Sequence, residues 1–213
     1  MTALSGMASL VLLAITWNRL MDALDAILTR RTVPPAKMGP PGPDAVELRR
    51  ILAAGAAAPD HGLLRPFRFL VVQDEGRARL GELFAACVRR AALDVSPQEI
   101  EKQRTAPLRA PVIVIVVAKV EQDHPKIPAI EQIAAAAAAA QNMLLAAHAL
   151  GFAAKWATGR QAYDEGVKAG LGLGPADRII GFLYLGSYAA EHRAAPRGGI
   201  EDIVQAWPPA MEG

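Results

Sequence analysis

Residues Ile130–Gly151 read IEQIAAAAAAAQNMLLAAHALG, and this stretch decides how the rest of the chain must be arranged. Its seven consecutive alanines, Ala134–Ala140, lose almost no side-chain entropy in a helix, and Gly151 stands where a helix usually ends. No Asp, Glu, Lys or Arg occurs between Glu131 and Lys155. A helix this uniformly apolar must be buried on nearly all sides. We therefore predict a central helix of about 33 Å that crosses the whole domain.

A membrane span is the competing interpretation of this stretch, because an uncharged run of this length meets the usual minimum of about 18 residues. Alanine is only weakly apolar, however, and four polar side chains would be costly in lipid: Gln132, Gln141, Asn142 and His148. The many small side chains let neighbouring backbones approach closely, which suits a core or dimer-forming helix. We expect a buried helix and no membrane partner.

Composition narrows the function classes. Of the 213 residues, 52% are hydrophobic and 21% are charged, which excludes a disordered chain. The net charge is only +2 and no long basic run occurs, so we expect no nucleic-acid partner. The single Cys87 excludes an internal disulfide, fits a cytoplasmic protein, and shares a helical apolar row with Leu80 and Phe84. The four histidines lack metal-ligand spacing, so we expect no catalytic metal.

The first twenty residues differ from the rest. They have an apolar patch, but no basic residue before it and no small-residue cleavage site after it, so a secretory signal is weakly supported. A better-patterned segment begins at Met21. We predict that residues 1–20 form an N-terminal extension outside the fold, and that residues 21–213 form one domain.

Hydrophobic periodicity predicts helices and strands in an order typical of an α+β domain. The expected helices besides the central one are Asp22–Arg31, Pro43–Ala57, Asp74–Leu93, Pro97–Gln103 and Gln161–Leu171. The expected strands are Phe67–Gln73, Val112–Ala118, Ala154–Thr158 and Ile179–Leu185. The run VIVIVVA at Val112–Ala118 shows no polar alternation, so helices should cover both faces of the sheet. Strictly alternating βα units are absent, which disfavours a doubly wound parallel sheet.

Three short stretches could carry chemistry. Arg30-Arg31-Thr32 ends a helix, where cations often only complement the helix dipole, but two guanidiniums and a hydroxyl also suit a phosphate. The loop from Ala58 through His61 to Phe67 is either a plain connector, with His61 capping a backbone group, or part of a site. In Gly151–Gly159 (GFAAKWATG), Trp156 is either a core residue or part of a ligand surface.

Familiar nucleotide and hydrolase signatures are missing from the sequence. There is no P-loop, no G-x-S-x-G elbow and no H-E-x-x-H pair. Gly170, Gly172 and Gly174 follow a helix and precede a strand, which is the wrong context for a dinucleotide-binding loop. We interpret them as a loop that terminates a helix.

Five segments, in this order and spacing, resemble the small FMN-dependent nitroreductases, in particular their YdjA-type branch. The segments are MDALDAILTRRT from Met21, AAPDHGLLRPFRFLVV from Ala57, APVIVIVVAKV from Ala110, GFAAKWATG from Gly151 and IIGFLYLG from Ile179. The resemblance implies a three-layer α-β-α sandwich, in which helices cover a central and mostly antiparallel sheet. It also implies that the long alanine-rich helix is buried.

The resemblance further implies which residues bind the cofactor. Those matching the family's FMN contacts are Arg30, Arg31 and Thr32 for the phosphate and ribityl chain, Ala57 and His61 from the partner subunit, and Trp156, Ala157 and Thr158 beside the flavin. Those matching a stretch associated with NAD(P) are Ala146, Ala147, His148, Ala149, Leu150 and Gly151.

The implied function is that of an oxidoreductase in which the flavin carries the chemistry. Hydride passes from NAD(P)H to flavin N5 and then to a nitroaromatic, a quinone or a similar acceptor, in a ping-pong cycle without a catalytic side chain. Because loops from two chains contact one FMN, the resemblance implies a homodimer with an extensive interface. The alternatives are a non-catalytic flavin-binding relative and, third, a purely structural helical module.

Two departures from the family pattern motivate the non-catalytic alternative. Arg65-Pro66-Phe67 stands where the family usually has Gln-Pro-Trp, and Trp156-Ala157-Thr158 stands where it usually has Trp-Arg-Ser. An arginine is thus lost at one position and gained at another. Arg65 and Lys155 are candidates for cations near the flavin pyrimidine, and Arg197 is a candidate for a second phosphate contact.

Overall fold

The computed structural model describes residues 21–91, 94–189 and 198–207. The predicted extension at residues 1–20 and the candidate Arg197 lie outside the described residues. The α-helices are α2 (Ala23–Thr29), α3 (Ala45–Ala56), α4 (Asp74–Ala91), α5 (Pro97–Thr105), α6 (Ala129–Ala149) and α7 (Glu165–Gly170). The strands are β1 (Phe67–Val72), β2 (Val112–Ala118), β3 (Ala153–Ala157) and β4 (Arg178–Gly186).

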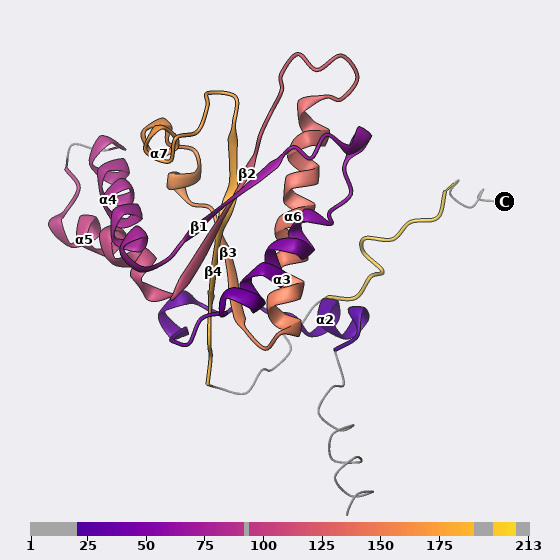
Figure 1. Cartoon of the computed structure of the whole chain (residues 1–213), viewed down its shortest axis with the longest axis horizontal. Coiled ribbons are helices and arrows are strands. Elements are labelled where there is room, and N and C mark those ends of the chain that lie inside the picture. Colours follow the sequence, from indigo (N-terminus) through magenta and orange to yellow (C-terminus); the bar gives the residue numbers. More distant parts are fainter. Residues whose placement is uncertain (1–20, 92–93, 190–197, 208–213) are drawn as a thin grey trace, which may run out of the picture.

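The four strands form one antiparallel sheet in the order β1-β2-β4-β3 (Figure 1). Strand β2 spans Val112–Ala118, as predicted, and all seven of its residues are buried. Each β-branched residue faces one of two cores, because successive side chains of a strand point to opposite faces. Strands β1 and β3 are therefore the two edges of the sheet.

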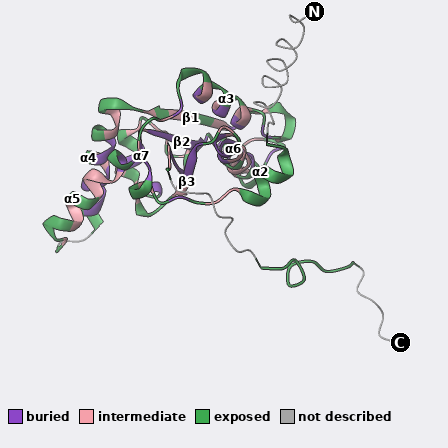
Figure 2. Ribbon diagram, turned by 90° about the horizontal axis from the view of Figure 1, so that it is seen from below, coloured by how far each residue is buried: buried purple, intermediate pink, exposed green. Residues whose placement is uncertain are grey.

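Helices cover both faces of this sheet, which confirms the predicted three-layer α-β-α sandwich. On one face, Ile113 and Phe182 pack with residues of α4 and α7 such as Phe84. On the other face, Val114 packs with residues of α3 and α6 such as Met143. Figure 2 shows the buried residues gathered along the sheet and along the sides of the helices that face it.

The central helix α6 lies where the sequence placed it, but the single chain buries only one side of it. Residues such as Ala136, Ala139 and Ala140 are fully buried. An opposite stripe stays exposed or half-buried, and it consists mainly of apolar residues: Ile130, Ala134, Ala137, Ala138, Gln141, Leu145 and Ala149. The expectation of burial on nearly all sides is thus wrong for one chain alone. No helix in the described ranges is long and apolar enough to cross a membrane.

The buried Gln132 shows how α6 tolerates a polar residue in its first turns. Its amide nitrogen donates to the carbonyl oxygens of Glu121 and Ile127, at 2.9 Å each. Its amide oxygen accepts a hydrogen bond of 2.8 Å from the backbone N–H of Glu121. The side chain therefore satisfies backbone groups of the loop that connects β2 to α6.

Two other helices differ from expectation. In α2, the apolar residues Leu24 and Leu28 are 69% and 63% exposed, because no other part of the described chain covers them. The helix predicted at Gln161–Leu171 is divided into a short 3-10 turn (Arg160–Ala162) and α7. Asp164 causes this break, since its carboxylate accepts a hydrogen bond from Val167 N–H and so begins a new helix.

Cys87 provides a test of the core on the α4 face. The residue is fully buried, as predicted, and burial raises the pKa of its thiol from 9.0 to about 11, with the Asp164 carboxylate adding to the shift. The folded thiol thus keeps its proton at pH values where the unfolded thiol has lost it. The contribution to stability is complete below pH 9 and is lost as the pH rises towards 11.

We therefore expect the free energy of unfolding to fall by about 1 kcal/mol more in the wild type than in Cys87→Ala when the pH rises from about 8 to about 10. Urea unfolding at several pH values measures this difference. Tyr184, whose pKa burial raises to about 12, contributes equally to both proteins and cancels. If the free energy of unfolding had the same pH dependence in both proteins, the raised pKa of the Cys87 thiol would be contradicted.

Candidate functional site

The segment after α2 runs beside the edge strand β3. Thr32 forms a parallel bridge with Ala154, and the backbone N–H of Val33 donates to the Ala154 carbonyl at 3.1 Å. Two of the three stretches singled out in the sequence, Arg30–Thr32 and Gly151–Gly159, therefore lie together. Arg30 and Arg31 are half-buried there, and Thr32 is exposed.

Arg31 is held in place by an aromatic ring. Its guanidinium carbon lies 5.3 Å from the centroid of Tyr188, which follows β4. This cation–π contact holds the cation beside the same sheet edge. A positive group, a hydroxyl and an exposed strand edge are thus combined in one place.

Trp156 is both part of the core and part of this edge. Its indole N–H donates to the carbonyl of Ile180 at 2.9 Å, and the residue is half-buried. The ring lies directly over Gly181, where a Cβ atom would be only 2.2 Å from the indole nitrogen. The neighbouring Ala157 is half-buried and Thr158 is exposed. Position 181 therefore needs glycine for Trp156 to lie flat against the sheet.

The C-terminal end of α6 meets the same region. His148 Nε2 lies 2.9 Å from the hydroxyl of Thr29, the residue just before Arg30. Of the six residues predicted for NAD(P), Ala147 and His148 are buried in the single chain, whereas Ala146 and Leu150 are half-buried and Ala149 and Gly151 are exposed. Gly151 has φ of 86° and ends the helix as expected.

The loop with Ala57 and His61 lies elsewhere. His61 Nδ1 is 2.7 Å from the Glu131 carboxylate, in the first turn of α6, and both side chains are about half exposed. Among the described residues, the His61 side chain pairs with Glu131, although the connector interpretation expected it to cap a backbone group. That task belongs to Asp60, whose carboxylate accepts a hydrogen bond of 3.2 Å from Arg65 N–H. His61 and Glu131 line a cavity of about 380 Å³ against the alanines of α6.

The two groups of predicted FMN contacts lie at opposite ends of α6. Thr29 contacts His148 at its C-terminal end, whereas His61 contacts Glu131 at its N-terminal end. Seventeen residues of helix separate these contacts, which corresponds to about 25 Å. Figure 1 shows α2 at the lower end of α6 and the loop after α3 near its upper end. One chain alone cannot place both groups around one ligand.

The two candidate cations are also separated. Lys155 is half-buried on β3, and Arg65 precedes β1 at the opposite edge of the sheet. Three strand spacings lie between these edges, about 14 Å. Glu131 and Tyr188 could not be predicted as partners of His61 and Arg31, because these contacts join residues far apart along the chain.

Comparisons with known proteins agree with this architecture. The model of the Nitroreductase family matches residues 27–187. The protein named "Putative NAD(P)H nitroreductase YdjA" from Escherichia coli strain K12 is 39% identical over 169 residues, which cover 78% of this chain and 88% of that protein. The chain therefore belongs to the nitroreductase family.

Solved structures show the same fold. A nitroreductase-like family protein from Bacillus cereus has a TM-score of 0.75 at 21% identity, over 90% of this chain and 98% of that one. The structure described as a "putative nitroreductase in complex with fmn" from Desulfovibrio desulfuricans has a TM-score of 0.64 at 26% identity, over 90% of this chain and 98% of that one.

The contact between Trp156 and Gly181 yields a prediction. In Gly181→Ala the new methyl group cannot coexist with the indole, so Trp156 must leave the sheet and its hydrogen bond to Ile180 is lost. We expect a loss of about 1–3 kcal/mol of stability and a red shift of tryptophan fluorescence. Gly174→Ala is the matched control, because the nearest atom there is an ordinary 3.6 Å away. Unchanged stability and fluorescence in Gly181→Ala would refute this account.

Proposed function

We propose that this member of the nitroreductase family is an FMN-dependent oxidoreductase that uses NAD(P)H to reduce a nitroaromatic, a quinone or a similar acceptor. The observation that carries the proposal is the edge of β3, where Arg31, Thr32 and Trp156 lie together. Family membership supports the reaction class, and the FMN complex of the Desulfovibrio desulfuricans relative supports the cofactor.

The residues at this edge fit the parts of an FMN molecule. A guanidinium and a hydroxyl suit the terminal phosphate, and we assign Arg31 and Thr32 to it, with Arg30 beside them. Trp156, Ala157 and Thr158 are assigned to the flavin ring, since they continue along the same strand and turn. Ala146–Gly151, at the end of α6, is assigned to the nicotinamide nucleotide.

When bound, FMN supplies hydride transfer in two half-reactions, which gives ping-pong kinetics with one substrate replacing the other. The chain's own residues then have binding tasks. Arg31 holds the phosphate, Trp156 fixes the position of the ring, and Lys155 on the same strand provides a positive charge nearby. No residue of the site is assigned a nucleophilic or acid–base role. The rate of hydride transfer depends instead on how firmly the chain positions the cofactor.

We further propose that the site is completed in a homodimer. The exposed apolar stripe of α6 and the exposed Leu24 and Leu28 of α2 require a cover, and a second copy would bury them. If two α6 helices pack antiparallel about a twofold axis, the N-terminal end of one lies beside the C-terminal end of the other. Ala57 and His61 of one chain would then reach the β3 edge of its partner.

A visible absorption spectrum tests the proposed reaction. We expect the purified protein to show flavin bands that disappear when NADPH or NADH is added without oxygen and return when an acceptor such as a benzoquinone is added. Flavin bands that persist with both nucleotides would favour the non-catalytic flavin-binding alternative. A colourless protein that takes up no added FMN would overturn the proposal.

A pair of variants tests the assigned contacts and the dimer. In Arg31→Ala, loss of the phosphate cation should weaken FMN binding at least tenfold while leaving the dimer intact, because Arg31 lies at the sheet edge and not on the α6 stripe. In Ala138→Glu, a charge in the middle of the stripe should convert the dimer to monomers and release the flavin as well.

Flavin fluorescence measures the first effect, and sedimentation measures the second. Ala78→Glu is the control for the added charge, since Ala78 is exposed on α4, on the other face of the sheet. Full flavin occupancy in Arg31→Ala would contradict the phosphate assignment. A monomeric Ala138→Glu protein that keeps its flavin would contradict the two-chain site.

A further inference from the structure

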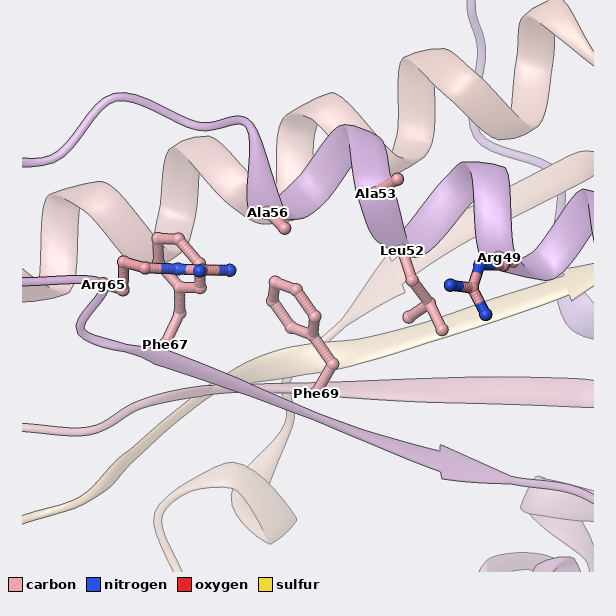
Figure 3. A pocket seen from close by; sticks show the side chains of 7 residues that line it. All are labelled: Arg49, Leu52, Ala53, Ala56, Arg65, Phe67 and Phe69. Carbon is pink, nitrogen blue, oxygen red and sulfur yellow. The ribbon is translucent and has the colours of Figure 1, made fainter. Parts of the chain in front are cut away.

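A second pocket, separate from the β3 edge, opens between α3 and the edge strand β1. Its volume is about 500 Å³. On one side, Arg49, Leu52 and two alanines recur at helical spacing along one face of α3. On the other side, Phe67 and Phe69 point from the same face of β1, because they are two residues apart on a strand (Figure 3).

The two phenylalanines line the pocket with parallel aromatic rings. Their ring centroids are 5.5 Å apart and their planes differ by 6°, so the rings are stacked in parallel. Both residues are half-buried, which leaves part of this surface open to solvent. Such a surface suits another planar ring, because stacking and apolar burial both favour it.

Arginines stand at the two ends of this surface. Figure 3 shows Arg65 at the loop end, near Phe67, and Arg49 at the far end, with Phe69 and Leu52 between them. Within the described ranges, neither guanidinium has a hydrogen bond or an ion pair, and both residues are exposed. Arg68, by contrast, forms an ion pair with Asp177.

The backbone holds Arg65 in its position. Its φ is 51°, in the left-handed region that non-glycine residues seldom adopt. The Asp60 carboxylate accepts a hydrogen bond from its N–H, and Phe67 N–H donates to its carbonyl at 2.8 Å. The starting direction of the side chain is thus set before any ligand arrives, which lowers the cost of binding.

We infer that this pocket binds a planar aromatic compound that carries carboxylate or sulfonate groups. The ring packs against the rings of Phe67 and Phe69, and the acidic groups pair with Arg49 and Arg65. Guanidinium groups match carboxylates with two parallel hydrogen bonds, so a compound with acidic groups at both ends binds best. Within one chain this pocket is separate from the β3 edge, because β1 and β3 are opposite edges of the sheet.

Titration calorimetry with 2,6-naphthalenedicarboxylate tests the inference. The protein is used as purified, after gel filtration has removed free flavin. We expect saturable binding that weakens with added salt, and at least tenfold weaker binding of the uncharged 2,6-naphthalenedimethanol. Arg49→Gln and Arg65→Gln should each weaken the dicarboxylate at least tenfold.

Arg50→Gln is the matched control, because Arg50 is the next residue of α3, is also exposed and does not line the pocket. It should change the affinity by less than about twofold. Phe69→Leu should weaken the dicarboxylate and the uncharged diol by the same factor, because both lose the stacking surface. Absence of saturable binding, or equal affinities in the wild type and both pocket variants, would overturn the inference. Circular dichroism melting confirms that each variant is folded.

Discussion

The close packing of α6 on the sheet and on α3 is the constraint on which the rest of the structure depends. Buried alanines such as Ala136 and Ala140 keep the sheet-facing side of α6 thin. On α3, a Cβ atom at Gly55 would lie 2.3 Å from the end of Met143, so the two helices can approach only because position 55 has no side chain. This contact sets how closely α3 approaches α6, and the loop after α3 reaches the N-terminal end of α6, where His61 contacts Glu131.

The length of the same helix then determines what one chain can assemble. The contacts of His61 with Glu131 and of Thr29 with His148 tie one loop and one short helix to opposite ends of α6. A helix is stiff over this length, so the separation of about 25 Å is a fixed property of the fold. An exposed apolar stripe lies between the two ends of α6. In the dimer that we propose, a second copy of the chain buries this stripe.

Local sequence signals predicted most of the elements, because burial on both faces and helix propensity leave clear patterns. Val112–Ala118 was predicted to the residue, since its unbroken β-branched run is the least ambiguous strand signal in the chain. The prediction of one continuous helix at Gln161–Leu171 was wrong, because Asp164 caps a new helix inside an otherwise acceptable helical pattern. The exposure of Leu24 could not be predicted, because periodicity identifies an apolar face but not what covers it.

Predicting the candidate site depended on the family resemblance, and it missed what only tertiary contacts determine. Residue 65 is an example. In the sequence, the arginine at position 65 and the alanine at position 157 both depart from the family pattern. Together they suggest that one cation has moved between two positions of a flavin site. In the structure, Arg65 lines the α3–β1 pocket with Arg49, and Ala157 lies on β3 at the other edge of the sheet. Within one chain, the cation at position 65 therefore cannot replace the one missing at position 157. Within one chain, one departure changes the surroundings of the β3 edge and the other changes the charge of the α3–β1 pocket.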